Sequence, residues 1–236
     1  AGVFIQPTIS ALQRFQNEED EIIAVEPDSW QENIRPSLDI KWGLSPNSGV
    51  TATINPDYSQ IEGDVRQLNL NQRFAFYYPE RRPFFLDNID FFKDQSDVLY
   101  TRSIVDPFYG VKLAGREKNI DFGFLNSIDR KPMSSVNEKG TPGFTEEELE
   151  DTWAVNSFGR VRFDAFEQGY VGLVFADKRI ISDPLSDREE NPSGFSNVGG
   201  IDISVPFSEI WVTSAHSSFS LAGNDAESLF GNSSRF

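Results

Sequence analysis

The chain has 236 residues, of which 37 are acidic and 21 basic, so its formal net charge is -16. This acidic excess argues against nucleic acid as a partner, because a nucleic-acid binder must place cations against phosphates, and the lack of cysteine excludes disulfides and thiolate metal sites. No run of about 20 apolar residues occurs, which excludes a membrane-spanning helix, whereas a mean hydropathy of -0.41 suits a soluble protein and a transmembrane β-barrel equally.

Apolar and polar residues alternate along most of the chain, as expected for strands with one apolar and one polar face. Leu38, Ile40 and Trp42 illustrate this, because each is flanked by polar or small residues. We expect about ten strands of about ten residues, the length of a membrane-crossing strand, whereas globular strands are shorter. In chain order the segments are 3–11, 37–44, 50–54, 68–78, 109–113, 120–124, 155–164, 170–176, 201–205 and 211–221.

Turn signals at 45–49 and 167–169 are short, whereas two polar stretches at 131–151 and 182–196 are long. Outer-membrane barrels have short turns at one rim and long loops at the other. The pattern therefore predicts an all-β, antiparallel transmembrane barrel over residues 1–236 as one domain. A soluble secreted β-sandwich that serves as a binding module is the alternative, because its strands obey the same alternation.

The segments 55–64, 67–70 and 73–86 carry a family resemblance. They contain NPDYSQIEGD, QLNL and YYPERRPFFL, and they resemble the signature of a large family of bacterial outer-membrane β-barrels of unknown function. Members of that family often follow a periplasmic carbohydrate-binding family 9-like domain. The resemblance spans roughly residues 35–180, with small departures at Gly63, Asn71 and Asn88.

The resemblance implies a barrel in the outer membrane of a Gram-negative bacterium. It implies that this chain is the N-terminal part of a larger barrel, without its downstream strands or carbohydrate-binding domain. Outer-membrane lipid is the expected partner, and envelope proteins and carbohydrate are candidate partners. The expected function is a channel or transporter for a solute linked to glycan utilisation, and the alternative is a structural or docking barrel within an envelope complex.

The signature segments 55–64, 67–70 and 73–86 contain many polar side chains. In a barrel they should lie in the lumen or at one rim, because Lys or Arg facing lipid near the midplane costs roughly 2–4 kcal/mol. We interpret them as an internal polar network that holds barrel register, and alternatively as a constriction ring of Asp57, Glu62, Asp64 and Arg73. The apolar phase changes at Leu68, which predicts a bulge or turn near 66–67. The predicted site residues are Asp57, Gln60, Glu62, Asp64, Arg66, Arg73, Glu80, Arg81 and Arg82.

Two prolines stiffen the stretch 79–85. One interpretation is a rim or plug element that docks a partner or solute. The favoured interpretation is a rigid turn whose arginines pair with nearby acids such as Asp87 or Asp90, with Phe84 and Phe85 in the bilayer interface.

No catalytic site, cofactor or metal site is expected. The acidic runs 18–21 and 146–150 are typical of solvated loops, and no Walker, G-x-S-x-G or H-E-x-x-H pattern occurs. We interpret His216, the single histidine, as a structural residue that faces the lumen. Aromatic residues near strand ends predict the girdles of a membrane barrel, namely Trp42, Tyr77, Tyr78, Tyr100, Trp153, Trp211 and Phe236.

Overall fold

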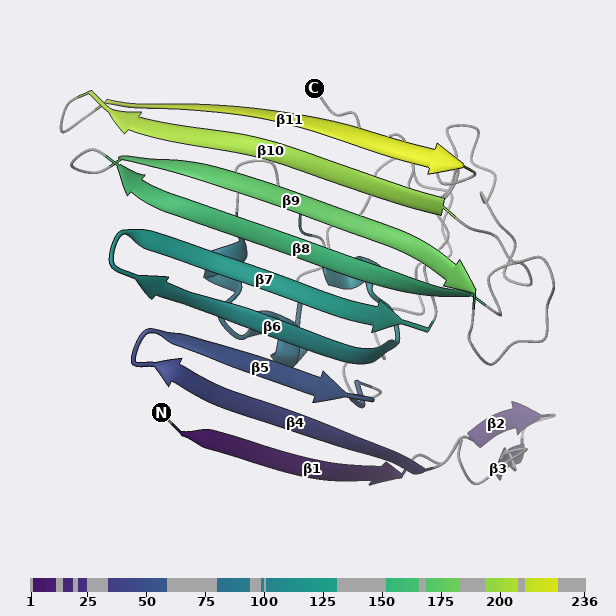
Figure 1. Ribbon diagram of the computed structural model, residues 1–236. Coiled ribbons are helices and arrows are strands. Elements are labelled where there is room, and N and C mark those ends of the chain that lie inside the picture. Colours follow the sequence, from purple (N-terminus) through teal and green to yellow (C-terminus); the bar gives the residue numbers. More distant parts are fainter. Residues whose placement is uncertain are drawn as a thin grey trace.

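The computed structural model describes residues 2–11, 15–18, 21–24, 34–58, 80–93, 99, 101–130, 152–165, 169–182, 194–207 and 211–224. A nine-stranded sheet dominates it (Figure 1). Its strands are β1 (Val3–Ala11), β4 (Ile34–Ser45), β5 (Ser48–Ile54), β6 (Pro107–Glu117), β7 (Ile120–Asp129), β8 (Thr152–Ala165), β9 (Gly169–Ser182), β10 (Gly194–Pro206) and β11 (Val212–Asn224). The remaining elements are the strand pair β2 (Phe15–Glu18) and β3 (Glu21–Ala24), the helix α2 (Pro83–Leu86), and the 3-10 helices η2 (Ile89–Phe92) and η3 (Thr101–Ser103).

Strands of the large sheet follow one another in chain order, and each pairs antiparallel with the next. The all-β, antiparallel prediction is therefore confirmed, and the predicted segments 3–11, 37–44 and 211–221 coincide closely with strands. The predicted segment 68–78 and the expected phase change near 66–67 lie outside the described residues. The described strands form an open sheet with β1 and β11 as its edges, rather than a closed barrel.

Connections between strands differ at the two ends of the sheet (Figure 1). The β4–β5, β6–β7, β8–β9 and β10–β11 connections share one end, and there β4 and β5 are joined by Pro46 and Asn47 alone. We call this the short-turn end. At the other end, which we call the long-loop end, β5 and β6 are separated by residues 55–106. The predicted loop 182–196 is shorter than expected, because Ser182 belongs to β9 and β10 begins at Gly194.

The two faces of the sheet differ in polarity. Residues that are opposite in register point to the same face, so the pairing assigns every strand residue to one of two faces. One face is apolar and partly exposed, as at Leu173, which is 48% exposed. Its members include Ile5, Ile40, Trp42, Val50, Ala52, Val111, Leu113, Phe122, Phe124, Val155, Val161, Leu173, Phe175, Ile201, Ile203, Phe219 and Leu221.

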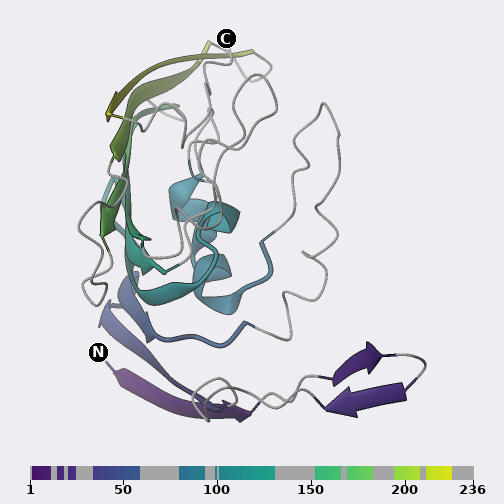
Figure 2. The same ribbon diagram turned by 90° about the vertical axis from the view of Figure 1, so that its right-hand side faces the viewer.

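The opposite face is largely polar and charged. It is the concave face, because the sheet curves and the short helices lie inside the curve (Figure 2). The apolar face is therefore convex. The concave members include Asp39, Lys41, Thr51, Thr53, Lys112, Arg116, Asp121, Ser127, Asp129, Asn156, Arg160, Arg162, Lys178, Asp202, Ser204, His216 and Ser218.

A small apolar core lies between the concave face and the short helices. Phe84, Phe85, Phe92 and Ile104 are buried there against concave side chains that include Leu125. Two glycines make room for the aromatic rings. A Cβ at Gly110 would lie 2.7 Å from the ring of Phe84, and one at Gly123 would lie 3.0 Å from that of Phe92. None of the helices in the described residues is long and apolar enough to cross a membrane.

Candidate functional site: the charged concave face and its inner segment

Residues 80–93 and 101–106, which we call the inner segment, lie on the concave face between β5 and β8 (Figures 1 and 2). They belong to the long connection between β5 and β6, and they contain α2, η2 and η3. Helix α2 contacts β5, and η2 contacts β7 and β8. The inner segment therefore covers part of the concave face.

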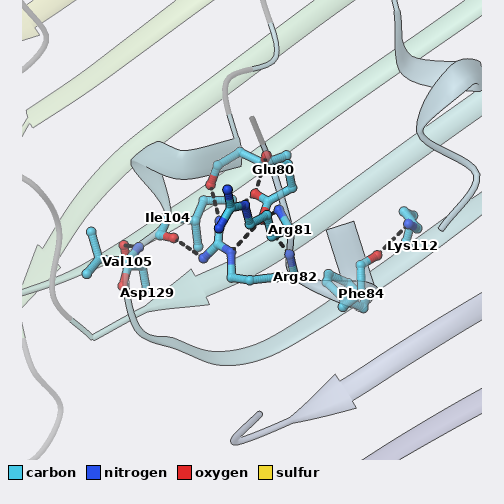
Figure 3. Close-up of polar contacts among 9 residues, drawn as sticks. Glu80, Arg81, Arg82, Phe84, Ile104, Val105, Lys112 and Asp129 are labelled. Atoms are coloured by element: carbon cyan, nitrogen blue, oxygen red, sulfur yellow. Dashed lines mark hydrogen bonds and ion pairs between the residues drawn. The ribbon is translucent and has the colours of Figure 1, made fainter. Parts of the chain in front are cut away.

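A buried ion pair holds the start of the inner segment together (Figure 3). Arg82 donates to both carboxylate oxygens of Glu80, from Nη2 to Oε2 at 2.7 Å and from Nε to Oε1 at 2.9 Å. Arg82 also donates to the carbonyl oxygens of Thr101 at 2.8 Å and Ile104 at 2.6 Å. Both partners are almost fully buried. Such a pair is stable only when its remaining donors and acceptors are satisfied, as they are here.

Neighbouring groups favour the ionised form of Glu80. Burial alone would raise the pKa of this carboxyl group, but the hydrogen bonds and charge of Arg82 and the hydroxyl of Thr101 lower it to about 2. Thr101 donates from Oγ1 to Oε2 of Glu80 at 2.6 Å. The backbone amides of Arg81 and Arg82 donate to Oε1 at 3.0 and 2.9 Å. The charged carboxylate of Glu80 thus connects residues 80–82 with Thr101 within the inner segment.

Lys112 of β6 connects α2 to the sheet. Its side chain is buried, and Nζ donates to the carbonyl oxygen of Phe84 at 2.5 Å (Figure 3). Nζ also donates to the carbonyl oxygen of Asp87. The last carbonyls of a helix lack partners within the helix, so a lysine can satisfy them. Lys41 of β4 adds an ion pair to the Asp87 carboxylate at 2.9 Å.

Asp129 of β7 holds the other end of the inner segment. Its Oδ2 accepts from the backbone amide of Val105 and its Oδ1 from that of Asp106, both at 2.8 Å. Arg130 then pairs with the Asp106 side chain at 2.9 Å. The inner segment is therefore attached to the sheet by polar contacts at both ends.

Nearer the short-turn end, four charged residues and one glycine form a row across five strands of the concave face. In register, Arg116 lies opposite Asp121, Asp121 opposite Arg162, Arg162 opposite Gly172, and Gly172 opposite Asp202. A Cβ at Gly172 would collide with the carboxylate of Asp202, so the glycine provides the space for that side chain. We call these residues the charged row.

Ion pairs connect the charged row within and between strands. Arg116 donates from Nη2 to Oδ2 of Asp121 at 2.6 Å, and Arg162 donates to Asp164 at 3.1 Å. One pleat away, Arg160 donates to Asp202 at 3.0 Å, and both side chains are buried. Within the part of the chain that the structure describes, Arg160 Nη1 and Asp202 Oδ1 have no hydrogen-bond partner. The row is thus a band of alternating charge.

Four of the predicted site residues are described. The structure brings Glu80 and Arg82 together, places the exposed Arg81 between them in sequence, and leaves Asp57 half-buried just after β5. Convergence of the whole signature stays a prediction, because the other members lie outside the described residues. Those members are Gln60, Glu62, Asp64, Arg66 and Arg73.

The structure confirms one expectation for the stretch 79–85 in part and contradicts another. Arg82 does pair with a nearby acid, but this acid is Glu80 rather than Asp87 or Asp90, which pair with Lys41 and Lys93. Phe84 and Phe85 are buried on the concave face rather than at a bilayer interface. The cause is the single turn of α2, which directs both rings towards the sheet, where Gly110 leaves space for Phe84.

The sequence did not predict the charged row. It also did not predict the contacts that attach the inner segment to the sheet. The signal was present, since Asp121, Arg160 and Arg162 fall on the polar side of alternating segments. Strand register was needed to place them next to one another. Among the described residues, no three His, Asp or Glu side chains are close enough together to hold a metal ion.

Comparison with family models finds a match in the N-terminal half of the chain. Residues 15–109 match the family model described as a domain of unknown function, DUF5916. The matched range contains the signature motifs and the whole inner segment. Neither a search of curated proteins nor a search of solved structures finds a match. The part of this chain that includes the inner segment is therefore similar to a domain family of unknown function.

Proposed function

We propose that the nine-stranded sheet is the wall of an outer-membrane β-barrel, whose concave face lines a path for polar solutes. The observation that carries the proposal is the polarity of the two faces: apolar side chains lie on the convex face and charged ones on the concave face. A β-sandwich would have the reverse arrangement, with its apolar face against a second sheet and its polar face in water. A barrel in lipid needs apolar side chains outside and polar ones inside.

Strand length and connections support the same proposal. β8 and β9 have 14 residues each and β10 and β11 have 13, whereas strands that cross a membrane need about 9–11 residues. Short turns at one end and long connections at the other are typical of outer-membrane barrels.

Aromatic residues lie near both ends of the sheet. Phe108 and Trp153, whose ring centroids are 5.6 Å apart, lie near the long-loop end. Trp42 and Trp211 lie near the short-turn end, and both are exposed. Such positions would suit two interfacial girdles, in which amphipathic rings sit at the headgroup level.

The directions of the two edge strands determine how many further strands are needed to close the sheet into a barrel. Because every pairing is antiparallel, β1 and β11 run in the same direction. Antiparallel closure therefore takes an odd number of further strands between them, and the even total that results is usual for bacterial barrels.

The inner segment sets the width of the path. Its attachment through Lys112 and Asp129 favours a fixed constriction, and it also favours a second candidate function, a plugged barrel that acts as a structural or docking element. Saccharides are the first solutes to test, because the signature resembles barrels that often follow a carbohydrate-binding domain.

Membrane fractionation followed by planar-bilayer recording tests the proposal. We expect the full-length protein in the outer-membrane fraction, where it should need detergent for extraction and should then conduct ions, with sugars reducing the current. A membrane-inserted protein without conductance would favour the plugged barrel. Recovery of the intact protein as a soluble monomer without detergent would contradict both.

A further inference from the structure

An open pocket lies on the concave face beside the charged row. Its volume is about 830 Å³, and it is bounded by the β4–β5 turn, by η2 and by β6 to β8. Asn47 and Ser48 line one side and Asn88 another, and the charged lining residues of the sheet are Arg116, Asp121 and Arg162. The inner segment thus leaves space next to two arginines of the wall.

The arginines form the accessible part of this charged lining. The side chains of Arg116 and Arg162 are 48% and 36% exposed, whereas that of Asp121 is 11% exposed. Asp121 lies between them in register, accepts two hydrogen bonds from Arg116, and is 3.7 Å from Nε of Arg162. Asp121 therefore holds Arg116 through two hydrogen bonds, Asp164 holds Arg162 through Nε and Nη2, and both arginines line the pocket.

Other charges near the pocket are paired. Asp90 also lines it, but the carboxylate is 2.6 Å from Nζ of Lys93. Asp164 accepts from Arg162 at 3.1 Å. Arg160, which shares the concave face of β8 with Arg162, adds a third guanidinium group. It donates to Asp202 at 3.0 Å, and its buried Nη1 has no hydrogen-bond partner among the described residues. The described charges thus include three closely spaced arginines from two strands.

We propose that Arg116 and Arg162 form a recognition site for oxyanions, namely the carboxylate or phosphate groups of solutes on the proposed path. Guanidinium groups bind such anions through paired N–H donors, with a geometry that lysine does not offer. The site favours anionic solutes although the chain has a formal net charge of -16. The passage of these solutes rests on the proposed function, whereas the binding of oxyanions at the two arginines does not. Because the pocket is on the concave face, opposite the apolar one, its ligand is a free solute rather than a lipid headgroup.

The test combines a binding and a conductance measurement on the full-length protein in detergent and in planar bilayers. Inorganic phosphate is titrated calorimetrically, and the reversal potential is recorded across a potassium chloride gradient. The variants are Arg116→Gln with Arg162→Gln, and the same two positions changed to lysine. The matched control is Arg179→Gln, because Arg179 is on the convex face of β9 and is also paired with an aspartate, Asp177.

We expect the wild type and the Arg179→Gln variant to bind phosphate and to show a chloride-preferring reversal potential. The double glutamine variant should bind phosphate about tenfold more weakly or worse, as expected for lost charge-assisted hydrogen bonds, and its preference for chloride should disappear. The double lysine variant, which keeps the charge, should keep the reversal potential and lose phosphate affinity.

Absence of phosphate binding by the wild type would overturn the inference, whether or not the protein conducts. Phosphate binding that survives both double substitutions would also overturn it, and so would a cation-preferring reversal potential that the variants leave unchanged. Arginine-dependent phosphate binding by a protein that does not conduct would support the site and refute only the proposed passage of solutes.

Discussion

Lys112 of β6 donates from Nζ to the carbonyl oxygen of Phe84 at 2.5 Å, and this contact joins the inner segment to the sheet. Replacement of Lys112 by Met should leave the carbonyls of Phe84 and Asp87 without their donor, at a cost of about 1–3 kcal/mol. The inner segment should then detach from the sheet more often. Trypsin should cleave after the exposed Arg81 several-fold faster in this variant.

The control for that experiment is Lys93→Met, which removes an exposed lysine of the inner segment that pairs with Asp90. It should leave the cleavage rate close to that of the wild type, because exposed ion pairs contribute little. Equal cleavage of the Lys112→Met variant and the wild type would show that the lysine does not hold the inner segment in place.

The Glu80–Arg82 pair predicts a stability loss in acid. The pKa of Glu80 falls from 4.5 to about 2 on folding, so its contribution to stability is complete above pH 4.5 and is lost as the pH falls towards 2. The Glu80→Gln variant should be less stable at neutral pH by about 3 kcal/mol, because it leaves a buried arginine charge without its partner. Urea unfolding at a series of pH values measures both effects.

The difference in unfolding free energy between wild type and Glu80→Gln should shrink through this acid range and vanish near its lower end. A difference that stays constant down to pH 2 would mean that folding does not lower the pKa of the Glu80 carboxyl group.

Gly110 should be intolerant of a side chain. A Cβ there would lie 2.7 Å from the Phe84 ring, so Gly110→Ala should destabilise the protein by roughly 1–3 kcal/mol through overpacking. Phe84→Leu should recover part of this loss, and a double-mutant cycle on unfolding free energies measures the coupling. Gly43→Ala is the control, because a Cβ at Gly43 has its nearest contact at 3.8 Å. Additive effects at Gly110 and Phe84 would disprove their contact.

Strand alternation made much of the fold predictable. Segments such as 3–11 and 211–221 became strands with nearly the predicted bounds, because one face of each had to be apolar. The strand pair β2 and β3 was missed, since the acidic run 18–21 hides any alternation there. Local sequence could not reveal the helices of the inner segment either, because helices as short as α2 form through contacts with the sheet.

It was harder to predict which residues of different strands lie next to one another. Asp121 and Arg162 are 41 positions apart in the sequence, and only the β7–β8 register places them opposite each other. The Glu80–Arg82 pair is local, but the sequence did not show that Arg82 would choose Glu80 over Asp87 or Asp90. Arg82 pairs with Glu80 because its side chain is buried where it also donates to the carbonyl oxygens of Thr101 and Ile104.

In the proposed barrel the convex face contacts lipid while the concave face contacts water. Because the chain contains no cysteine, single-cysteine variants at Leu173 of β9 and Ser218 of β11 can carry nitroxide spin labels without background. In register, Leu173 belongs to the convex face and Ser218 to the concave face. Power-saturation measurements in liposomes compare the access of oxygen, which concentrates in lipid, with that of a water-soluble nickel chelate. We expect oxygen to relax the label at Leu173 and the nickel chelate to relax the label at Ser218. Access of the nickel chelate to both labels, or the reverse pattern, would contradict a lipid-facing convex surface.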